Sequence, residues 1–139
     1  MCHDRHWQFY MIGKAIYGIL AANVGVTALV STRIYPDIAT QDAAFPFLVY
    51  MIESTGPSDT KDGTSKLDVV DFSLTAYAKT YTQAQDIAAA ARTALDRYKG
   101  TVNGVNIQSV HFKDQQSNQM EVDEKVFIVN QVYGLRQRR

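Results

Sequence analysis

The sequence predicts an α+β fold, in which a largely antiparallel sheet carries one main helix (residues 80–99) and a shorter N-terminal helix on one face. Three observations support this prediction. Residues 80–99 have the period of an amphipathic helix, and residues 67–77 alternate as a strand does. Apolar runs of strand length also lie on both sides of the main helix. Helix, strands, helix and strands then follow in order, which is typical of an α+β domain.

Length and composition indicate one domain without overall charge. The chain has 139 residues, and its 14 Lys and Arg balance 14 Asp and Glu, so no net field draws it to nucleic acid or to an anionic membrane. The single cysteine, Cys2, excludes an internal disulfide and fits a reducing compartment. The longest apolar run, residues 15–30, is interrupted and too short to span a bilayer. We expect the protein to be cytoplasmic where it is made, with no membrane and no sequence-specific nucleic acid as partner.

The first ten residues match neither a helical nor a strand period, and orderly patterning begins near Met11. We expect residues 1–10 to be a disordered extension and residues 11–139 to form the single domain. Cys2, His3 and His6 are zinc-binding residue types, but a tetrahedral site needs four ligands and no fourth lies at a suitable spacing. We therefore expect no metal site.

The next part of the chain predicts one helix and one strand. Residues 12–22 predict a helix because four apolar residues share one face: Ile12, Ile16, Ile19 and Leu20. Pro36 ends any helix and favours an extended Tyr35. Residues 45–52 predict a strand, with Pro46 tolerated near its start.

The segment Ser54–Lys66 is dense in Gly, Pro, Ser, Thr and Asp, which predicts a long flexible loop. A calcium-binding loop is excluded there. With Gly63 at the sixth position, the first, third and twelfth positions would be Ser58, Thr60 and Val69, which lack carboxylates. The segment is therefore predicted to be a loop without a metal.

Residues 67–77 alternate as a strand with one buried face, on which four side chains point the same way: Val70, Phe72, Leu74 and Ala76. Thr80 and Gln83 then have the spacing of a capping box that begins the main helix. Gly100 can adopt the left-handed conformation that ends it.

The main helix has a narrow apolar stripe that consists of Ala84, Ile87, Ala88, Ala91, Leu95 and Tyr98. Because three of these residues are alanine, the helix axis can approach a sheet closely. Gln85, Arg92 and Asp96 lie off the stripe and are expected to face solvent or a neighbouring subunit.

The C-terminal part predicts two more strands. After a turn at Asn103–Gly104, residues 105–113 form the first of them, and residues 114–119 are expected to be a polar connection. Residues 126–133 are apolar on both faces, which predicts a central or interface strand. Residues 134–139 are expected to be a solvated basic tail.

No catalytic motif occurs in the sequence, so we expect neither an enzyme nor a cofactor. Phosphate-binding glycine motifs and nucleophile elbows are missing. His111 lacks a catalytic partner at a recognisable spacing and is expected to be structural. The acidic residues Glu121, Asp123 and Glu124 are expected to be a solvated loop, because hard cations need six or more oxygens.

Two other functional classes stay open. A small-molecule-binding regulatory α+β module would need a pocket with converging polar groups, which the sequence does not visibly group. A small enzyme of unfamiliar type would have to use His111 with Asp114 or Glu121.

The order of these segments resembles the tail-completion family of long-tailed bacteriophages, which overlaps in fold with tail terminators. The matching pieces are a first helix that ends near Leu29, the segments Arg33–Pro36 and Phe45–Tyr50, the strand Asp71–Tyr77, and the Ala-rich helix that closes at Ala94–Leu95. The two terminal strands complete a resemblance that runs from about Met11 to Tyr133.

The resemblance implies a virion structural protein without catalysis or cofactor. Its subunits would form a ring, often hexameric, that caps the head-proximal end of the tail tube and joins it to the head. The implied partners are further copies of the chain, the tail-tube protein and the head–tail connector proteins. The implied location is the head-proximal end of the virion tail, after assembly in the host cytoplasm.

The family has no sharp motif that would assign contact residues. Our candidates for intersubunit, tail or head contacts are polar or aromatic residues of the loops and the C-terminus: Tyr35, Asp37, Ser58, Asp59, Lys61, Asp62, Arg136, Arg138 and Arg139.

Overall fold

The structure is a computed structural model that describes residues 5–36, 44–57, 67–121 and 125–138, with side chains for 12–36, 44–53, 69–116 and 126–138. Its elements are α1 (Arg5–Ala22), α2 (Val24–Val30), β1 (Ile34–Pro36), β2 (Phe47–Pro57), β3 (Leu67–Ala78), α3 (Tyr81–Leu95), β4 (Gly100–Val102), β5 (Val105–Glu121) and β6 (Lys125–Arg138). The six strands form one sheet in the order β1-β2-β3-β6-β5-β4. Only β1 and β2 are parallel. The predicted α+β class is therefore confirmed.

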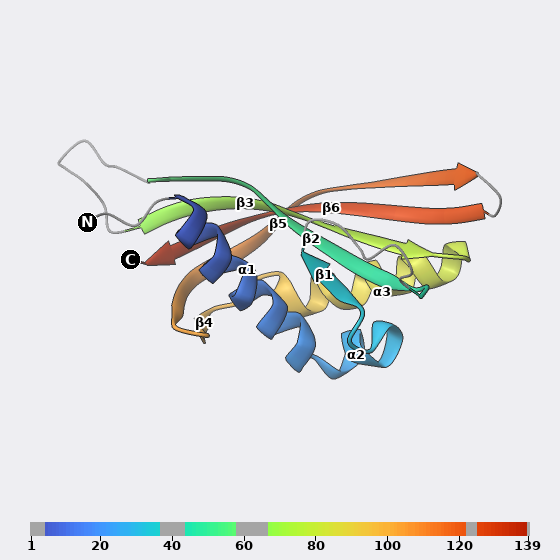
Figure 1. Cartoon of the computed structure of the whole chain (residues 1–139), viewed down its shortest axis with the longest axis horizontal. Coiled ribbons are helices and arrows are strands. Elements are labelled where there is room, and N and C mark those ends of the chain that lie inside the picture. The colour runs from blue at the N-terminus through green and yellow to red at the C-terminus, as the bar shows by residue number, and fades with distance from the viewer. Residues whose placement is uncertain (1–4, 37–43, 58–66, 122–124, 139) are drawn as a thin grey trace.

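The three helices form a layer on one face of the sheet (Figure 1). The buried residues of all three helices and one set of alternating strand residues form a single hydrophobic core. Phe72 and Tyr133 lie at its centre as stacked rings with centroids 5.3 Å apart. Strand residues of the other parity, such as Val49 on β2, lie outside this core and face away from the helices.

The alternation predicted for β3 is confirmed. The stripe predicted for α3 is confirmed for five of its six residues, because Tyr98 lies beyond the end of the helix and is half-buried. Val70, Phe72, Leu74 and Ala76 are at most 1% exposed. On α3 the stripe residues Ala84, Ile87, Ala88, Ala91 and Leu95 are at most 2% exposed. Small side chains therefore bring this helix close to the sheet.

The N-terminal helix is longer than predicted. It begins at Arg5 rather than Ile12, so that α1 has 18 residues and α3 has 15. Residues 5–10, which we expected to be disordered, are thus helical in the structure, while residues 1–4 lie outside the described residues. The domain boundary at Met11 stays a prediction.

Three segments expected to be loops or tails belong to long strands. Residues 54–57 continue β2, residues 114–119 lie inside β5, and residues 134–138 complete β6. β5 pairs with β6 along almost its whole length, from Glu121 opposite Lys125 at one end to Asn106 opposite Arg138 at the other. The polar side chains of these segments give no strand pattern, so the sequence did not predict the extensions. Backbone hydrogen bonds to a long neighbouring strand keep these segments in the sheet. Residues 58–66 of the predicted loop lie outside the described residues. β6 lies between β3 and β5, which confirms its predicted central position.

The main helix begins where predicted but ends earlier. Thr80 is the N-cap, and its hydroxyl accepts a hydrogen bond from Gln83 N at 3.2 Å. The last helical residue is Leu95, and Arg97, with φ of 64°, adopts the left-handed conformation that was expected of Gly100. Contacts with the edge of β5 explain this end. Arg97 N donates to the carbonyl of Val110 at 2.7 Å, and the Asp96 carboxylate accepts from Phe112 N at 3.2 Å.

The outer side of α3 is therefore less free than predicted. Asp96 binds the backbone of β5, and the Arg92 guanidinium lies 4.0 Å from the centroid of the Phe112 ring. A cation above an aromatic face is attracted to it. Both side chains thus attach the helix to the sheet.

Replacing Thr80 with alanine tests the cap. Thr80→Ala removes the acceptor for Gln83 N, so we expect the free energy of unfolding to fall by about 1 kcal/mol. Urea denaturation followed by circular dichroism measures this change. Thr80→Ser is the matched control and should stay within about 0.5 kcal/mol of the wild type. Equal losses in both variants would contradict the cap.

One buried polar network joins α3 to the sheet. The Gln131 side chain is 2% exposed, and its Nε2 donates to the carbonyl of Ala88 and to Gln115 Oε1, both at 3.0 Å. Its Oε1 accepts from the Tyr133 hydroxyl at 2.8 Å. Burial raises the pKa of Tyr133, and among the nearby charges Arg92 opposes that effect while Asp96 adds to it. The hydroxyl therefore remains protonated and serves as a donor.

Candidate functional site

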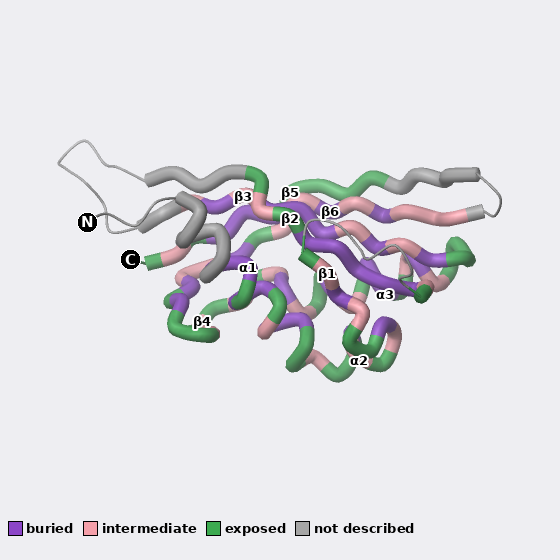
Figure 2. The backbone as a smooth tube through the Cα atoms, in the orientation of Figure 1, coloured by how far each residue is buried: buried purple, intermediate pink, exposed green. Residues whose placement is uncertain are grey.

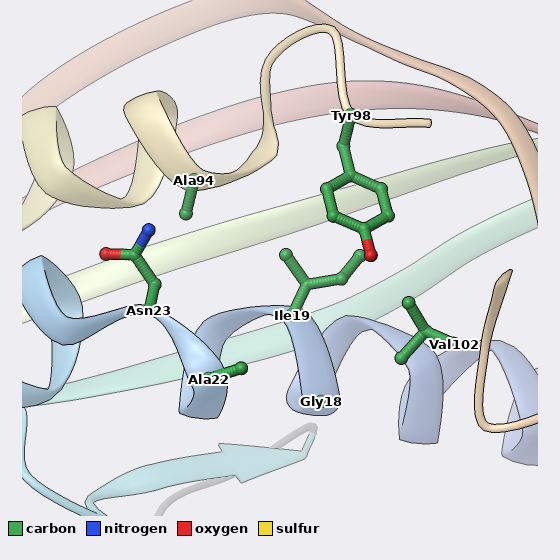
Figure 3. Close-up of a pocket in the computed structure, with 7 residues that line it drawn as sticks. All are labelled: Gly18, Ile19, Ala22, Asn23, Ala94, Tyr98 and Val102. Atoms are coloured by element: carbon green, nitrogen blue, oxygen red, sulfur yellow. The ribbon is translucent and has the colours of Figure 1, made fainter. Parts of the chain in front are cut away.

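A hollow lies between α1, the end of α3 and β4 (Figure 3). Its volume is about 290 Å³, and it is lined by Gly18, Ile19, Ala22, Asn23, Ala94, Tyr98 and Val102. The Tyr98 ring extends from the segment after α3 toward α1. None of these seven residues carries a carboxylate, an imidazole or a thiol. The hollow is therefore suited to apolar packing rather than to acid–base or metal chemistry.

Close packing of α1 against β4 positions one wall of the hollow. A Cβ at Gly18 would lie 2.9 Å from Val102 Cγ1, so only glycine permits this approach. Asn103 Nδ2 donates to the carbonyl of Lys14 at 2.9 Å. The predicted turn at Asn103–Gly104 is confirmed, since both residues have positive φ angles (49° and 81°).

The sheet face away from the helices carries an uncharged surface. We call the following residues the uncharged sheet surface: Val49, Met51, Thr75, Tyr77, Ile128 and Val132. They lie in adjacent register on β2, β3 and β6. Met51 is 42% exposed, and Ile128 and Val132 are half-buried. Asn130, which lies between the last two on β6, donates from Nδ2 to Thr75 Oγ1 at 3.1 Å.

An aromatic cluster borders this surface at one end. The Phe47 ring stacks on Tyr77 at 4.8 Å, meets Tyr35 edge-on at 5.9 Å and lies 5.1 Å from Phe45. Arg33 Nε donates to the carbonyl of Pro46 at 2.8 Å and so ties the start of β2 to β1. These contacts make that end of the surface well packed.

Charged side chains gather toward the opposite end of the same sheet face. Lys113 Nζ lies 2.6 Å from Asp71 Oδ1, with both side chains partly exposed. The His111 imidazole lies over Gly134, because a Cβ at Gly134 would be 2.6 Å from His111 Cε1. Arg136 is exposed two residues further along β6. The exposed Asp114 lies opposite Val132 across β5 and β6, and Lys79 Nζ lies 5.6 Å from the centroid of the Phe45 ring. Charged side chains therefore border the uncharged sheet surface at both ends.

The outer side of α1 and α2 forms a second uncharged surface. We call it the helical patch, and its residues are Tyr17, Ala21, Ala22, Val24, Gly25 and Ala28. Tyr17 is 37% exposed and Val24 is 80% exposed, and the other four are also exposed. Figure 2 shows exposed stretches of the chain around α2. No charged residue occurs from Ala15 to Thr32. Exposed surface without charge is typical of protein–protein contacts.

The helices of this patch are apolar, but they are short. None of the described helices is by itself long and apolar enough to cross a bilayer. The stretches Ile12–Ala22 and Val24–Val30 reach that length and hydropathy only together, and they are bent by 88°.

Sequence comparison decides the family. The profile of the family described as Tail completion protein gp17 matches residues 14–130 of the chain. The chain belongs to this tail-completion family. It is therefore a structural protein of a phage-type virion tail.

Solved structures share the fold of this tail-completion protein. A chain from the virion of a native gene transfer agent particle superposes with a TM-score of 0.77 at 20% identity, over 94% of this chain and 99% of that chain. A second solved chain gives a TM-score of 0.54 at 10% identity, over 83% and 87%. No curated protein matches the chain in sequence.

The structure describes three of the nine predicted contact residues of this tail-completion protein. Tyr35 lies on β1 and contacts Phe47 at the edge of the uncharged sheet surface. Arg136 and Arg138 are exposed on β6, six or more residues from Asn130, which shares a row with Tyr35. At roughly 3.4 Å per residue this is about 20 Å, so the structure does not bring them together. The other six lie outside the described residues: Asp37, Ser58, Asp59, Lys61, Asp62 and Arg139.

The sequence interpretation did not single out either uncharged surface. Ile128 and Val132 belong to the predicted central or interface strand, but no sequence pattern distinguishes Met51 or Val24 as a contact residue. The uncharged stretch from Ala15 to Thr32 was a usable signal, because exposed helices normally carry charge on their outer side.

The residues proposed for alternative chemistry form no recognisable site. Asp114 Oδ1 accepts from Gln115 N at 2.8 Å, and His111 makes no hydrogen bond within the described part of the chain. The described residues hold no group of three metal-ligating side chains. Cys2 and His3, the side chain of His6, and the acidic residues 121–124 lie outside what the structure describes.

Proposed function

We propose that the protein is a ring-forming tail-completion subunit that caps the head-proximal end of the tail tube and joins it to the head. The match of residues 14–130 to the tail-completion family carries this proposal. The likeness of almost the whole chain to a chain of a gene transfer agent virion supports it. The partners would be further copies of the chain, the tail-tube protein and the head–tail connector proteins.

The two uncharged surfaces agree with a ring. A closed ring is built from one heterologous contact that is repeated around an axis, so each subunit needs two different complementary patches. The helical patch belongs to the helix layer, and the uncharged sheet surface lies on the face that the helices leave open (Figure 1). A hexamer would need six copies of this one contact.

We further propose that the protein acts by assembly and carries out no reaction. The hollow between α1 and α3 offers only Asn23 and Tyr98 as polar side chains, which suits neither catalysis nor a strongly polar ligand. His111 lies on an exposed strand across Gly134 and lacks a positioned partner among the described residues. His111→Ala is therefore expected to leave assembly unchanged.

Purified protein and tail tubes that lack their head-proximal cap test the ring proposal. We expect negative-stain microscopy to show a ring at one end of each tube and capped tubes to join filled heads. Native mass spectrometry of the bound protein should give a single ring stoichiometry. Tubes that are already complete serve as the control and should bind no further protein. A protein that neither forms rings nor binds uncapped tubes would contradict the proposal.

A further inference from the structure

The helical patch combines exposure with a lack of charge. Val24 stands 80% exposed at the bend between α1 and α2, and Ala21, Ala22 and Ala28 are exposed around it. The hollow of about 290 Å³ borders the patch at Ala22, so the surface has both a protruding side chain and a recess. Interfaces gain most of their binding energy where such features fit together.

The uncharged sheet surface differs in shape from the helical patch, and it is also without charge among its six residues. Its side chains come from three adjacent strands and lie in register, which makes a broad surface rather than a groove. Met51 is its most exposed apolar side chain, at 42%, while Val49 is 8% exposed among its neighbours. Docking an uncharged partner on these six residues would remove apolar area from water, and Asp114, opposite Val132, would lie at the border of the contact.

The other described surfaces are less suited to a close subunit contact. The outer side of α3 carries Asp86 and Arg92, Lys99 lies in the segment after this helix, and the far end of the sheet carries Lys113 and Arg136. Burying such charges without partners costs free energy. The two uncharged surfaces therefore provide the best pair, and their separate layers prevent one subunit from joining its own two surfaces.

Building on the proposed ring, we propose that the helical patch of one subunit packs against the uncharged sheet surface of a second copy. The contact is heterologous, so every subunit uses both surfaces, and a rotation between neighbours that divides a full turn closes the chain of contacts into a ring. Met51 of one copy lies against the recess and the exposed residues around Val24 of its neighbour. The aromatic cluster with Tyr35 lies at the border of this contact.

Two charge substitutions, one on each surface, test the pairing. Val24→Asp follows the N-cap Asn23, where a carboxylate favours the start of a helix, so the variant should fold. Met51→Glu replaces an exposed strand residue. We expect each variant to lower the fraction of uncapped tube ends that carry a ring by at least about tenfold, since it buries an unpaired charge in the contact. Ala89→Asp, an exposed position on α3, is the control and should stay within about twofold.

Mixing the two variants identifies the pairing itself. Val24→Asp retains an intact sheet surface, and Met51→Glu retains an intact helical patch, so one productive contact remains between them. Amine cross-linking at concentrations that give ring-sized ladders with the wild type should give monomers for each variant alone. The equimolar mixture should give a dimer and nothing larger. Thermal unfolding of each variant within a few °C of the wild type establishes that it is folded.

Several outcomes would overturn the pairing. They are rings formed by either folded variant, dimers formed by one variant alone, a mixture that stays monomeric, and a mixture that extends beyond the dimer. Intact rings that no longer attach to tubes would assign these surfaces to the tail-tube protein instead. If the wild type itself neither forms rings nor caps tubes, the proposed function fails, whereas wild-type rings with insensitive variants refute the pairing alone.

Discussion

Ala88→Glu is expected to abolish the cooperative folding of the domain. Ala88 is 2% exposed on the α3 stripe, and its own carbonyl accepts the Gln131 side chain from β6 at 3.0 Å. A carboxylate at this position would be buried without a cation, and a longer side chain would push the helix off the sheet. The cost is about 4 kcal/mol or more, a large part of the stability of a domain of this size.

Thermal unfolding by circular dichroism measures this effect. We expect either no cooperative transition or a melting temperature at least about 12 °C lower than that of the wild type. Ala89→Glu is the matched control, because Ala89 is the next residue on α3 and is exposed, so its stability should change by less than about 0.5 kcal/mol. If Ala88→Glu folded normally and lost only assembly, the α3 stripe would be an interface between subunits. That result would contradict its place in the hydrophobic core.

Gln131→Leu is expected to destabilise the domain by about 2 kcal/mol although it makes the core more apolar. The substitution removes the acceptor of the Tyr133 hydroxyl, which lies 2.8 Å from Gln131 Oε1 in the buried core. It also removes the bonds to Ala88 and Gln115 that join α3 and β5 through β6. A buried polar group without a partner costs about 1–3 kcal/mol.

A double-mutant cycle separates the network from simple packing. Tyr133→Phe deletes the hydroxyl that Gln131→Leu leaves unpaired, so the double variant should be destabilised by at least about 1 kcal/mol less than the sum of the single variants. Urea denaturation gives the four free energies of unfolding. Additive losses would show that the hydroxyl and the amide act independently, which would contradict the network.

The sequence predicted the elements whose side chains repeat. The stripe of α3, the alternation of β3 and the N-cap Thr80 all follow from local periodicity or from one short hydrogen bond. The order of these elements was also enough for the tail-completion resemblance, which the family match confirms. Local patterns succeed here because each one reports the face that its own segment buries.

The candidate site was much less predictable. The sequence favoured Arg136, Arg138 and Tyr35 as contact residues, although the two arginines lie at the end of the sheet that is remote from Tyr35. The uncharged surfaces consist of ordinary apolar and small residues, and only the fold shows which of them stay exposed. Val24 and Val26 are both valines of α2, yet they are 80% and 0% exposed.

The sequence by itself determined the α+β class, the buried stripe of α3 and the beginning of that helix. The tertiary structure decided where strands and helices end. β5 and β6 continue through polar residues because each supplies the other's backbone hydrogen bonds, a pairing that side-chain patterns do not encode. α3 ends at Leu95 rather than at Gly100, since the edge of β5 binds Asp96 and Arg97 and turns the chain there.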